Sequence, residues 1–129
     1  MGRVVKCSIV ICDDFNAVLI AARGKKKLQK VWSIFGKDIK GKETSQQCVS
    51  KAIDKDLNCT IFDMMPFKEY VLDKQNGDIS VVYTGKIKHY INTHRDINQV
   101  KWITENELGM YDFEEGEKEI LIDFFKRNK

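Results

Sequence analysis

The chain has 129 residues, of which 43% are hydrophobic and 32% are charged, and its formal net charge is +3. A chain of this length and composition can bury a substantial core, so we expect one domain over residues 1–129. The small net charge does not by itself indicate nucleic-acid or membrane binding, because such binding needs many phosphate contacts. No signal peptide opens the chain and no apolar run approaches the ~20 residues that span a bilayer, so we expect a cytoplasmic protein.

Charge is unevenly distributed along the chain. Basic residues gather between positions 23 and 42, and acidic residues gather between positions 104 and 119. The lysine-rich run 25–30 predicts a solvated loop, with a phosphate or RNA contact as the alternative. An RNA contact would make binding weaken steeply with salt.

The first third of the chain predicts strands. Residues 4–12 and 17–22 are apolar runs rich in β-branched side chains, separated by a polar turn. Two such runs around a turn predict a β-hairpin. A basic loop then leads to a short apolar strand at 31–35, which Gly36 closes.

A helix is predicted after Thr44. Thr44 and Gln47 have the spacing of a capping box, and Asn58 suits the left-handed residue that ends a helix. The apolar side chains between these caps recur on one helical face. They are Cys48, Val49, Ala52, Ile53 and Leu57.

Two long strands follow this helix. Residues 60–72 and 79–91 are strand-like. The Asn-Gly pair at 76–77 favours a tight type I′ turn between them. We therefore expect a second hairpin.

The end of the chain predicts a strand and a helix. A short strand at 100–103 precedes a helical turn capped by Thr104 and Glu107. The apolar residues of the closing helix share one face, and they are Ile120, Leu121, Phe124 and Phe125. The order of elements predicts an α/β fold, with a mixed sheet sandwiched between helices.

The cysteines and histidines suggest no catalytic or metal site. The cysteines are Cys7, Cys12, Cys48 and Cys59, and they lack the close spacing of zinc ligands. We expect them to be reduced thiols in the core. His89 and His94 are expected at the surface, and no serine or cysteine has a histidine placed to activate it.

The segment from Trp32 to Thr44, WSIFGKDIKGKET, resembles the motif W-x-F-P-G-G-x-x-E-x-G-E-T at the start of a Nudix box. The Nudix box itself is G-x5-E-x7-R-E-U-x-E-E-x-G-U, with U aliphatic. Placed on this chain, it starts at Lys37, has its first glutamate at Glu43 and ends at Cys59. The resemblance covers nearly the whole chain. It implies a MutT-like Nudix α/β/α sandwich with a mixed sheet.

Positions outside the box also resemble functional positions of MutT-type proteins. Arg23 stands where a phosphate-contacting arginine is often found, and Asp96 where an additional metal-binding glutamate lies. Trp102 matches the tryptophan that follows that metal loop. Glu117 stands where an Asp or Asn after a Y-x-F segment, here residues 111–113, reads the base. Its alternative role is that of a first-turn glutamate favoured by the helix dipole.

The resemblance implies that the substrate is a nucleoside triphosphate or another nucleoside diphosphate compound. Aromatic side chains that could stack on a base are Trp32, Phe35, Tyr111 and Phe113, with core packing as the alternative. Phe35 stands where the family has proline, so we assign it to a ligand.

The helix of the box departs from the family in its carboxylates. Nudix hydrolysis is an attack of water on a phosphorus of a diphosphate, and it uses divalent ions, which prefer oxygen ligands. The resemblance places glutamates at the positions of Ala52, Lys55 and Asp56, of which only Asp56 keeps a carboxylate. Lys37 replaces the first glycine of the box. We therefore expect metal affinity and hydrolysis to fall, while phosphate can still be held.

Two hypotheses about the altered box remain open. In the first, Glu43, Asp56 and Asp96, with Asp38 as a further candidate, form a reduced site for one Mg²⁺ or Mn²⁺ ion. Glu43 and Asp56 would then be the catalytic carboxylates. In the second, the Lys55 ammonium replaces the metal, pairs with Asp56 and contacts a phosphate; its alternative is a solvated lysine. The residues that we assign to ligand binding are Arg23, Phe35, Lys37, Lys55 and Glu117.

Three functions are compatible with this sequence. The first is a domain that binds a nucleotide or another phosphate-containing small molecule with little or no hydrolysis, and we favour it. The second is a weakly active pyrophosphohydrolase that depends on Mg²⁺ or Mn²⁺. The third is a protein-interaction module that keeps the fold and has lost the ligand.

Overall fold

A computed structural model of the chain describes residues 3–23, 31–87, 93, 97–114 and 116–127. Nothing is described of the side chains of Arg23 and Asn98. The elements in chain order are β1 (Arg3–Ile11), β2 (Val18–Arg23), β3 (Trp32–Ser33), β4 (Phe35–Asp38), α1 (Ser45–Leu57), β5 (Ile61–Asp73), β6 (Asp78–Ile87), β7 (Ile97–Ile103), the 3-10 helix η1 (Glu105–Met110) and α2 (Glu117–Arg127).

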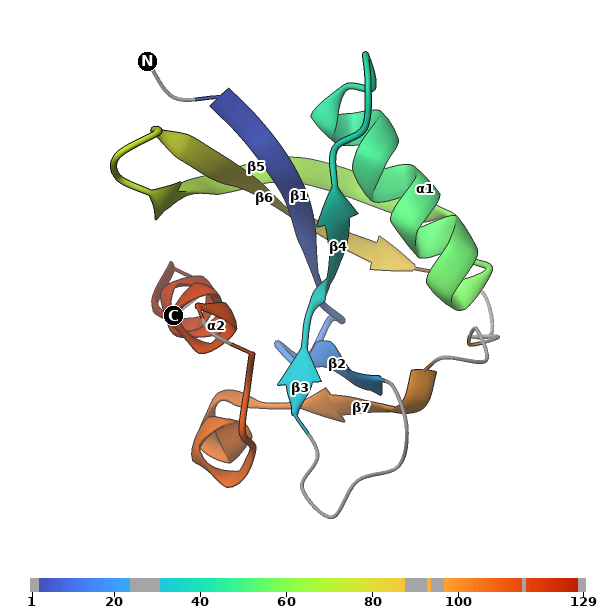
Figure 1. The fold of residues 1–129 in the computed structure, drawn as a ribbon. Coiled ribbons are helices and arrows are strands. Elements are labelled where there is room, and N and C mark those ends of the chain that lie inside the picture. The colour runs from blue at the N-terminus through green and yellow to red at the C-terminus, as the bar shows by residue number, and fades with distance from the viewer. Residues whose placement is uncertain (1–2, 24–30, 88–92, 94–96, 115, 128–129) are drawn as a thin grey trace.

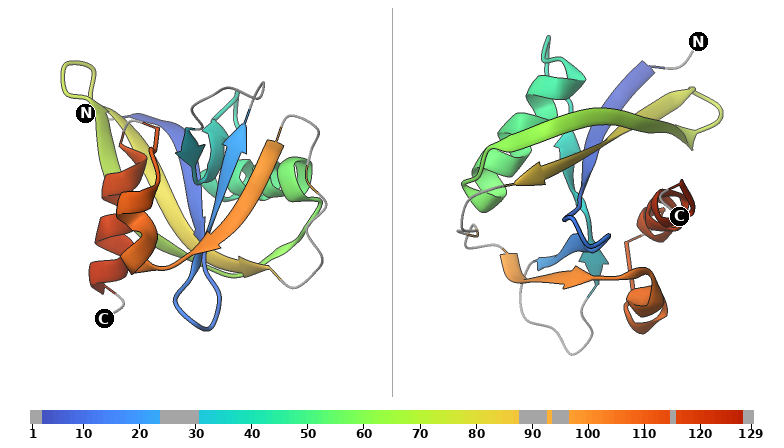
Figure 2. Two further views of the ribbon diagram at one scale, coloured as in Figure 1. Left: turned by 90° about the horizontal axis from the view of Figure 1, so that it is seen from below. Right: turned by 180° about the vertical axis from the view of Figure 1, so that it is seen from behind.

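The strands form two sheets that together make the middle layer. A mixed four-stranded sheet has the order β4-β1-β6-β5, and a three-stranded sheet has the order β3-β2-β7. Within the first sheet, β1 pairs with β6 in parallel and with β4 antiparallel. Helices α1 and α2 lie on opposite sides of β1 and β4 (Figures 1 and 2). The predicted α/β class with a mixed sheet is confirmed.

Each helix covers one apolar face of this middle layer. Cys7, Ile9 and Ile11 of β1 pack in a core with the apolar face of α1. Val10 belongs to a second core, on the side of α2. Because successive side chains of a strand point to opposite faces, Lys6 and Ser8 share the α2 side with Val10. Strand β1 therefore separates two chemically different surfaces.

The helices follow their predicted caps. Gln47 N donates to Thr44 Oγ1 at 3.1 Å, and Thr44 N donates to Gln47 Oε1 at 3.0 Å. Asn58 ends α1 with a φ of 53°. Thr104 N donates to Glu107 Oε1 at 3.0 Å at the start of η1. In α2, the predicted apolar face is buried. Local capping signals thus located these elements correctly.

The predicted first hairpin is wrong. The turn forms, because Asp13 Oδ1 accepts from the N–H groups of Phe15 and Ala17 at 2.8 and 2.9 Å. Beyond the single bridge between Cys12 and Val18, however, β1 and β2 enter different sheets. The reason is that β4 and β6 already occupy both edges of β1.

The second hairpin forms, but its turn is not type I′. A type I′ turn needs a positive φ at both central residues. Gly77 has a φ of 74°, and Asn76 is not among the described residues with positive φ. Gly77 N donates to Asp73 O at 2.8 Å, and Asn76 Nδ2 donates to Asp73 Oδ2 at 2.8 Å. The Asp73 side chain thus stabilises a longer turn.

The prediction of four reduced thiols is also wrong. A disulfide joins Cys7 of β1 to Cys48 in the first turn of α1. The two Cα atoms are 6.4 Å apart although the residues are separated by 41 positions. Cys12 and Cys59 are free, as predicted.

In the part of the chain that the structure describes, no helix is long and apolar enough to cross a membrane.

We expect the disulfide to be detectable by counting thiols. Denatured, unreduced protein should show the two thiols of Cys12 and Cys59, and four thiols after reduction. Reduction should lower the free energy of unfolding by about 4 kcal/mol, because the bond closes a long loop in the unfolded chain. The double variant Cys7→Ala, Cys48→Ala should be insensitive to reductant. Four thiols before reduction would contradict the bond.

Candidate functional site

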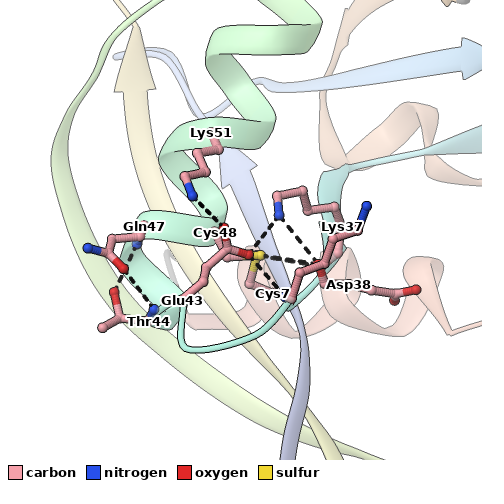
Figure 3. Close-up of a disulfide and its surroundings, with 9 residues drawn as sticks. Cys7, Lys37, Asp38, Glu43, Thr44, Gln47, Cys48 and Lys51 are labelled. Atoms are coloured by element: carbon pink, nitrogen blue, oxygen red, sulfur yellow. Dashed lines mark hydrogen bonds and ion pairs between the residues drawn. A yellow bond between two sulfur atoms is a disulfide. The ribbon is translucent and has the colours of Figure 1, made fainter.

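The loop before α1 carries a compact charged cluster. Lys37 Nζ of β4 lies 2.7 Å from Glu43 Oε1, and Lys51 Nζ of α1 lies 3.0 Å from Glu43 Oε2 (Figure 3). Lys40 N also donates to Glu43 Oε1, at 3.2 Å. The Glu43 side chain is only 6% exposed. Both of its carboxylate oxygens are therefore occupied by nitrogen donors.

These donors make the Glu43 carboxyl group more acidic than an ordinary glutamate. The hydrogen bonds from Lys37 and then from Lys51 lower the pKa of Glu43 from 4.5 to about 2. The disulfide lies beside this cluster, since the sulfur atoms of Cys7 and Cys48 are each 3.6 Å from the carbonyl oxygen of Lys37. The backbone of Lys37 is thus held against α1 while its side chain reaches Glu43.

The other box positions offer little to a divalent ion. Ala52 and Asp56 are buried, and Lys55 is exposed. Figure 3 shows the Asp38 carboxylate pointing away from Glu43. Among the described residues, no group of three or more His, Cys, Asp or Glu side chains is placed to hold a metal ion. Asp96, the third predicted ligand, lies outside the described residues.

Divalent ions such as Mg²⁺ prefer several oxygen ligands. In this chain the Glu43 carboxylate is already bound by two ammonium groups, and an ion there would have to displace them. The described donor set therefore does not fit a Nudix-type metal site.

A cleft lies on the other side of β4, next to the start of α2. It has a volume of about 340 Å³, and its lining residues are Lys6, Ser8, Ser33, Ile34, Gly36, Glu114 and Glu117. A second hollow of about 300 Å³ shares Lys6, Ser8 and Glu117 with the first. The two hollows thus adjoin along β1 and the start of α2.

Gly36 is needed where β4 meets β1. Its partner in the register is Ser8. A Cβ atom at position 36 would collide with the carbonyl oxygen of Cys7 and with Ser8. The glycine therefore permits the close pairing of the two strands and leaves this wall of the cleft without a side chain.

Glu117 brings a buried carboxyl group to the cleft. It is the first residue of α2 and is 7% exposed. Burial raises its pKa, while the charge of Lys6 and a hydrogen bond from the Ile34 N–H act in the opposite direction. A protonated carboxyl can donate as well as accept a hydrogen bond. The cleft thus combines an ammonium group, hydroxyl groups and a carboxyl of raised pKa.

A backbone link brings the segment before α2 to this cleft. Trp32 N donates to Asp112 O at 2.8 Å, and Glu114 N donates to Trp32 O at 2.9 Å. The rings of Trp32 and Tyr111 pack edge to face, with centroids 5.4 Å apart. Contacts across the β3 strand therefore place Glu114 and Glu117 beside β4.

Five of the predicted site residues lie at three places in the structure. Lys37 and Glu43 meet in the cluster, Glu117 lies in the cleft, and Lys55 and Asp56 lie on α1. The assignment of Phe35 to a ligand is wrong, because its side chain is completely buried in the core with α1. The side chain of Arg23, Asp96, the lysine-rich run and both histidines lie outside the described residues.

Lys6 and Ser8 are site residues that the sequence patterns did not predict. They alternate with Cys7 and Ile9 in the run 4–12, which the sequence predicts only as an apolar strand. Two polar residues at alternate positions of an apolar strand indicate that one of its faces is not packed wholly in the core. Lys51 was also missed as a partner of Glu43.

We expect Glu43 to make folding stability depend on acid pH. Its pKa is lower in the folded chain, so its contribution is complete above pH 4.5 and is lost as the pH falls toward about 2. Glu43→Gln should lower the stability at neutral pH and flatten its dependence within this window. Urea unfolding at a series of pH values measures both, with Asp54→Asn as the exposed control on α1. Equal slopes for Glu43→Gln and the unmodified chain would contradict the cluster.

No protein-family model matches the sequence, and no curated protein matches it. Solved structures do match. One, from work on MutT of Aliivibrio salmonicida and Vibrio cholerae, has a TM-score of 0.80 at 14% identity, covering 97% of this chain and 99% of that one. A Nudix hydrolase from Nitrosomonas europaea has a TM-score of 0.76 at 12% identity, covering 98% and 90%.

The Nudix domain of Shewanella oneidensis NrtR, solved in complex with ADP ribose, has a TM-score of 0.75 at 14% identity, covering 100% of this chain and 90% of that one. At such low identities, the likeness concerns the backbone and leaves the chemistry to the residues described above. The likeness agrees with the mixed sheet and the helices of this chain. This chain has the fold of the Nudix superfamily, as the box spacing predicted.

Proposed function

We propose that this chain binds a nucleotide or another diphosphate-containing ligand in the cleft between β1 and the start of α2, with little or no hydrolysis. The observation that carries the proposal is the contrast between two neighbouring features. The cleft is open and polar, whereas the remaining glutamate of the box is bound by two lysines.

The cleft has the properties of a small-molecule site. A volume of about 340 Å³ is within the range of ligand pockets, which orient their ligands with a few polar groups. Lys6 supplies a cation, and Glu117 supplies a carboxyl of raised pKa that suits hydrogen bonds to a base. The complex of a fold neighbour with ADP ribose supports a ligand of this class.

Slow or absent hydrolysis follows from the lost carboxylates. Attack of water on phosphorus is accelerated by divalent ions that activate the water and neutralise the phosphate oxygens. Ala52 has no metal-binding atom, and Lys55 adds a positive charge. A weak enzyme that uses Mg²⁺ or Mn²⁺ at Glu43, Asp56 and Asp96 is the alternative, and product formation decides between the two.

We rank nucleic-acid and protein partners below a small-molecule ligand. A phosphate-containing small molecule is the expected ligand, and neither a nucleic acid nor a protein partner is needed for the cleft to act. We place this function in the cytoplasm. The number of free thiols in protein isolated under thiol-blocking conditions bears on that location, because structural disulfides are rare in reducing compartments.

We expect nucleotides to raise the unfolding temperature without divalent ions. ADP-ribose and a panel of nucleoside triphosphates should be tested in EDTA and then with Mg²⁺ or Mn²⁺. A ligand at 100 times its dissociation constant adds about 2.7 kcal/mol to stability, which is readily detected. Phosphate or pyrophosphate release should stay at the level of the blank. Metal-dependent turnover would instead support the weak hydrolase.

We expect Glu117→Ala to weaken the binding of any nucleotide found in this way by about tenfold or more, because a buried hydrogen bond to the ligand is lost. Calorimetric titration measures the change. Lys118→Ala is the matched control, because this neighbouring side chain is exposed and does not line the cleft. Equal affinities for Glu117→Ala and the control would place the ligand elsewhere.

A further inference from the structure

The charged cluster around Glu43 carries more positive than negative charge. Two ammonium groups share one carboxylate, and Lys40 and Lys42 are exposed in the same loop. Lys55 is also exposed, one helical turn after Lys51, and like charges at this spacing repel each other. A bound anion would relieve this repulsion.

Glu43 holds the two nearest lysines in place while leaving them accessible. Its own side chain is 6% exposed, whereas those of Lys37 and Lys51 are 27% and 66% exposed. An ammonium group has three N–H donors. Each lysine uses one donor on Glu43, and Lys37 also approaches the carbonyl oxygen of Asp38 at 3.4 Å. Donors therefore remain for a ligand on the solvent side.

The cluster and the cleft lie on the two faces of the same strand. Gly36 and Lys37 are consecutive residues of β4, which is the edge strand of its sheet. Since alternate residues of a strand face opposite sides, Gly36 borders the cleft and Lys37 faces α1. A ligand seated against Gly36 has only one strand edge to cross before it reaches the Lys37 ammonium.

We propose that Lys37 and Lys51, positioned by Glu43, form a binding site for the diphosphate or longer phosphate chain of the ligand, and that this site works without a divalent ion. The inference rests on the proposed function, since it names the groups that hold the phosphate end of the same ligand. Lysine is a common phosphate binder that acts as a compact point charge. In this site the Lys37 ammonium supplies the positive charge that a metal ion would bring.

The test uses inorganic pyrophosphate and tripolyphosphate as probes, in EDTA, with calorimetric titration of the full chain. Both probes should bind, and adding Mg²⁺ should not tighten binding. Lys37→Met and Lys51→Met should each weaken binding by about tenfold or more, because a charged hydrogen bond is lost. Lys37→Arg should retain most of the affinity, because it retains the charge.

Lys118→Met is the control, since it removes one exposed lysine of α2 and should leave binding unchanged. Lys51 is largely exposed, so its variant keeps the test valid if Lys37→Met fails to fold. Binding that requires Mg²⁺, or equal weakening in the cluster variants and the control, would overturn the inference. Nucleotide binding that depends on Glu117 but not on Lys37 or Lys51 would overturn it while leaving the proposed function intact. Pyrophosphate binding at the lysines, with no nucleotide bound in the cleft, would support the phosphate site and overturn the proposed nucleotide binding.

Discussion

Strand β1 organises the fold, because it lies between two other strands and between two hydrophobic cores. Its edges are occupied by β4 and β6, so β2 is directed into a second sheet. On one face, Cys7 and Ile9 pack toward α1; on the other, Lys6 and Ser8 border the cleft. One strand thus places the disulfide and the polar cleft on opposite sides of a single sheet.

Strand β4 extends this two-sided arrangement to the edge of the sheet. Gly36 lies opposite Ser8 and keeps the cleft wall free of a side chain, whereas Lys37 reaches Glu43 on the other face. The disulfide and the pairing of β4 with β1 hold the Lys37 backbone. Two consecutive residues therefore connect a polar cleft with a cluster of excess positive charge.

The residues that stand at the expected box positions are physically consistent with one another. A lysine at position 37 beside an intact set of carboxylates would compete with a divalent ion for their oxygens. Ala52 and Lys55 offer no carboxylate to a divalent ion, and Glu43 pairs with two ammonium groups. The pKa of Glu43 is lowered because these lysines stabilise its ionised form. In our proposals, such a site retains the attraction for phosphate and lacks the means to activate water.

Most of the local elements and the type of fold can be predicted from the sequence alone. Capping residues such as Thr44 and Asn58 act within a few positions of the chain. The box can be identified from its spacing alone, even where a carboxylate is absent. Glu117 can also be singled out from sequence, because its distance from an aromatic segment is a local property, and its role toward a ligand stays a prediction. Phe35 was assigned wrongly, since one unusual residue in a motif does not tell which face of the strand it occupies.

The disulfide, the partners of Glu43 and the cleft became visible only in the folded chain. Cys7 and Cys48 are separated by 41 positions, and their meeting depends on how α1 packs on β1. In the sequence, Lys6 and Ser8 interrupt an apolar strand. In the structure, the pairing of β1 with β4 and the position of α2 make these two residues line a cleft. Contacts between distant segments depend on strand order and helix placement, and those arise from the packing of the whole chain rather than from any local pattern.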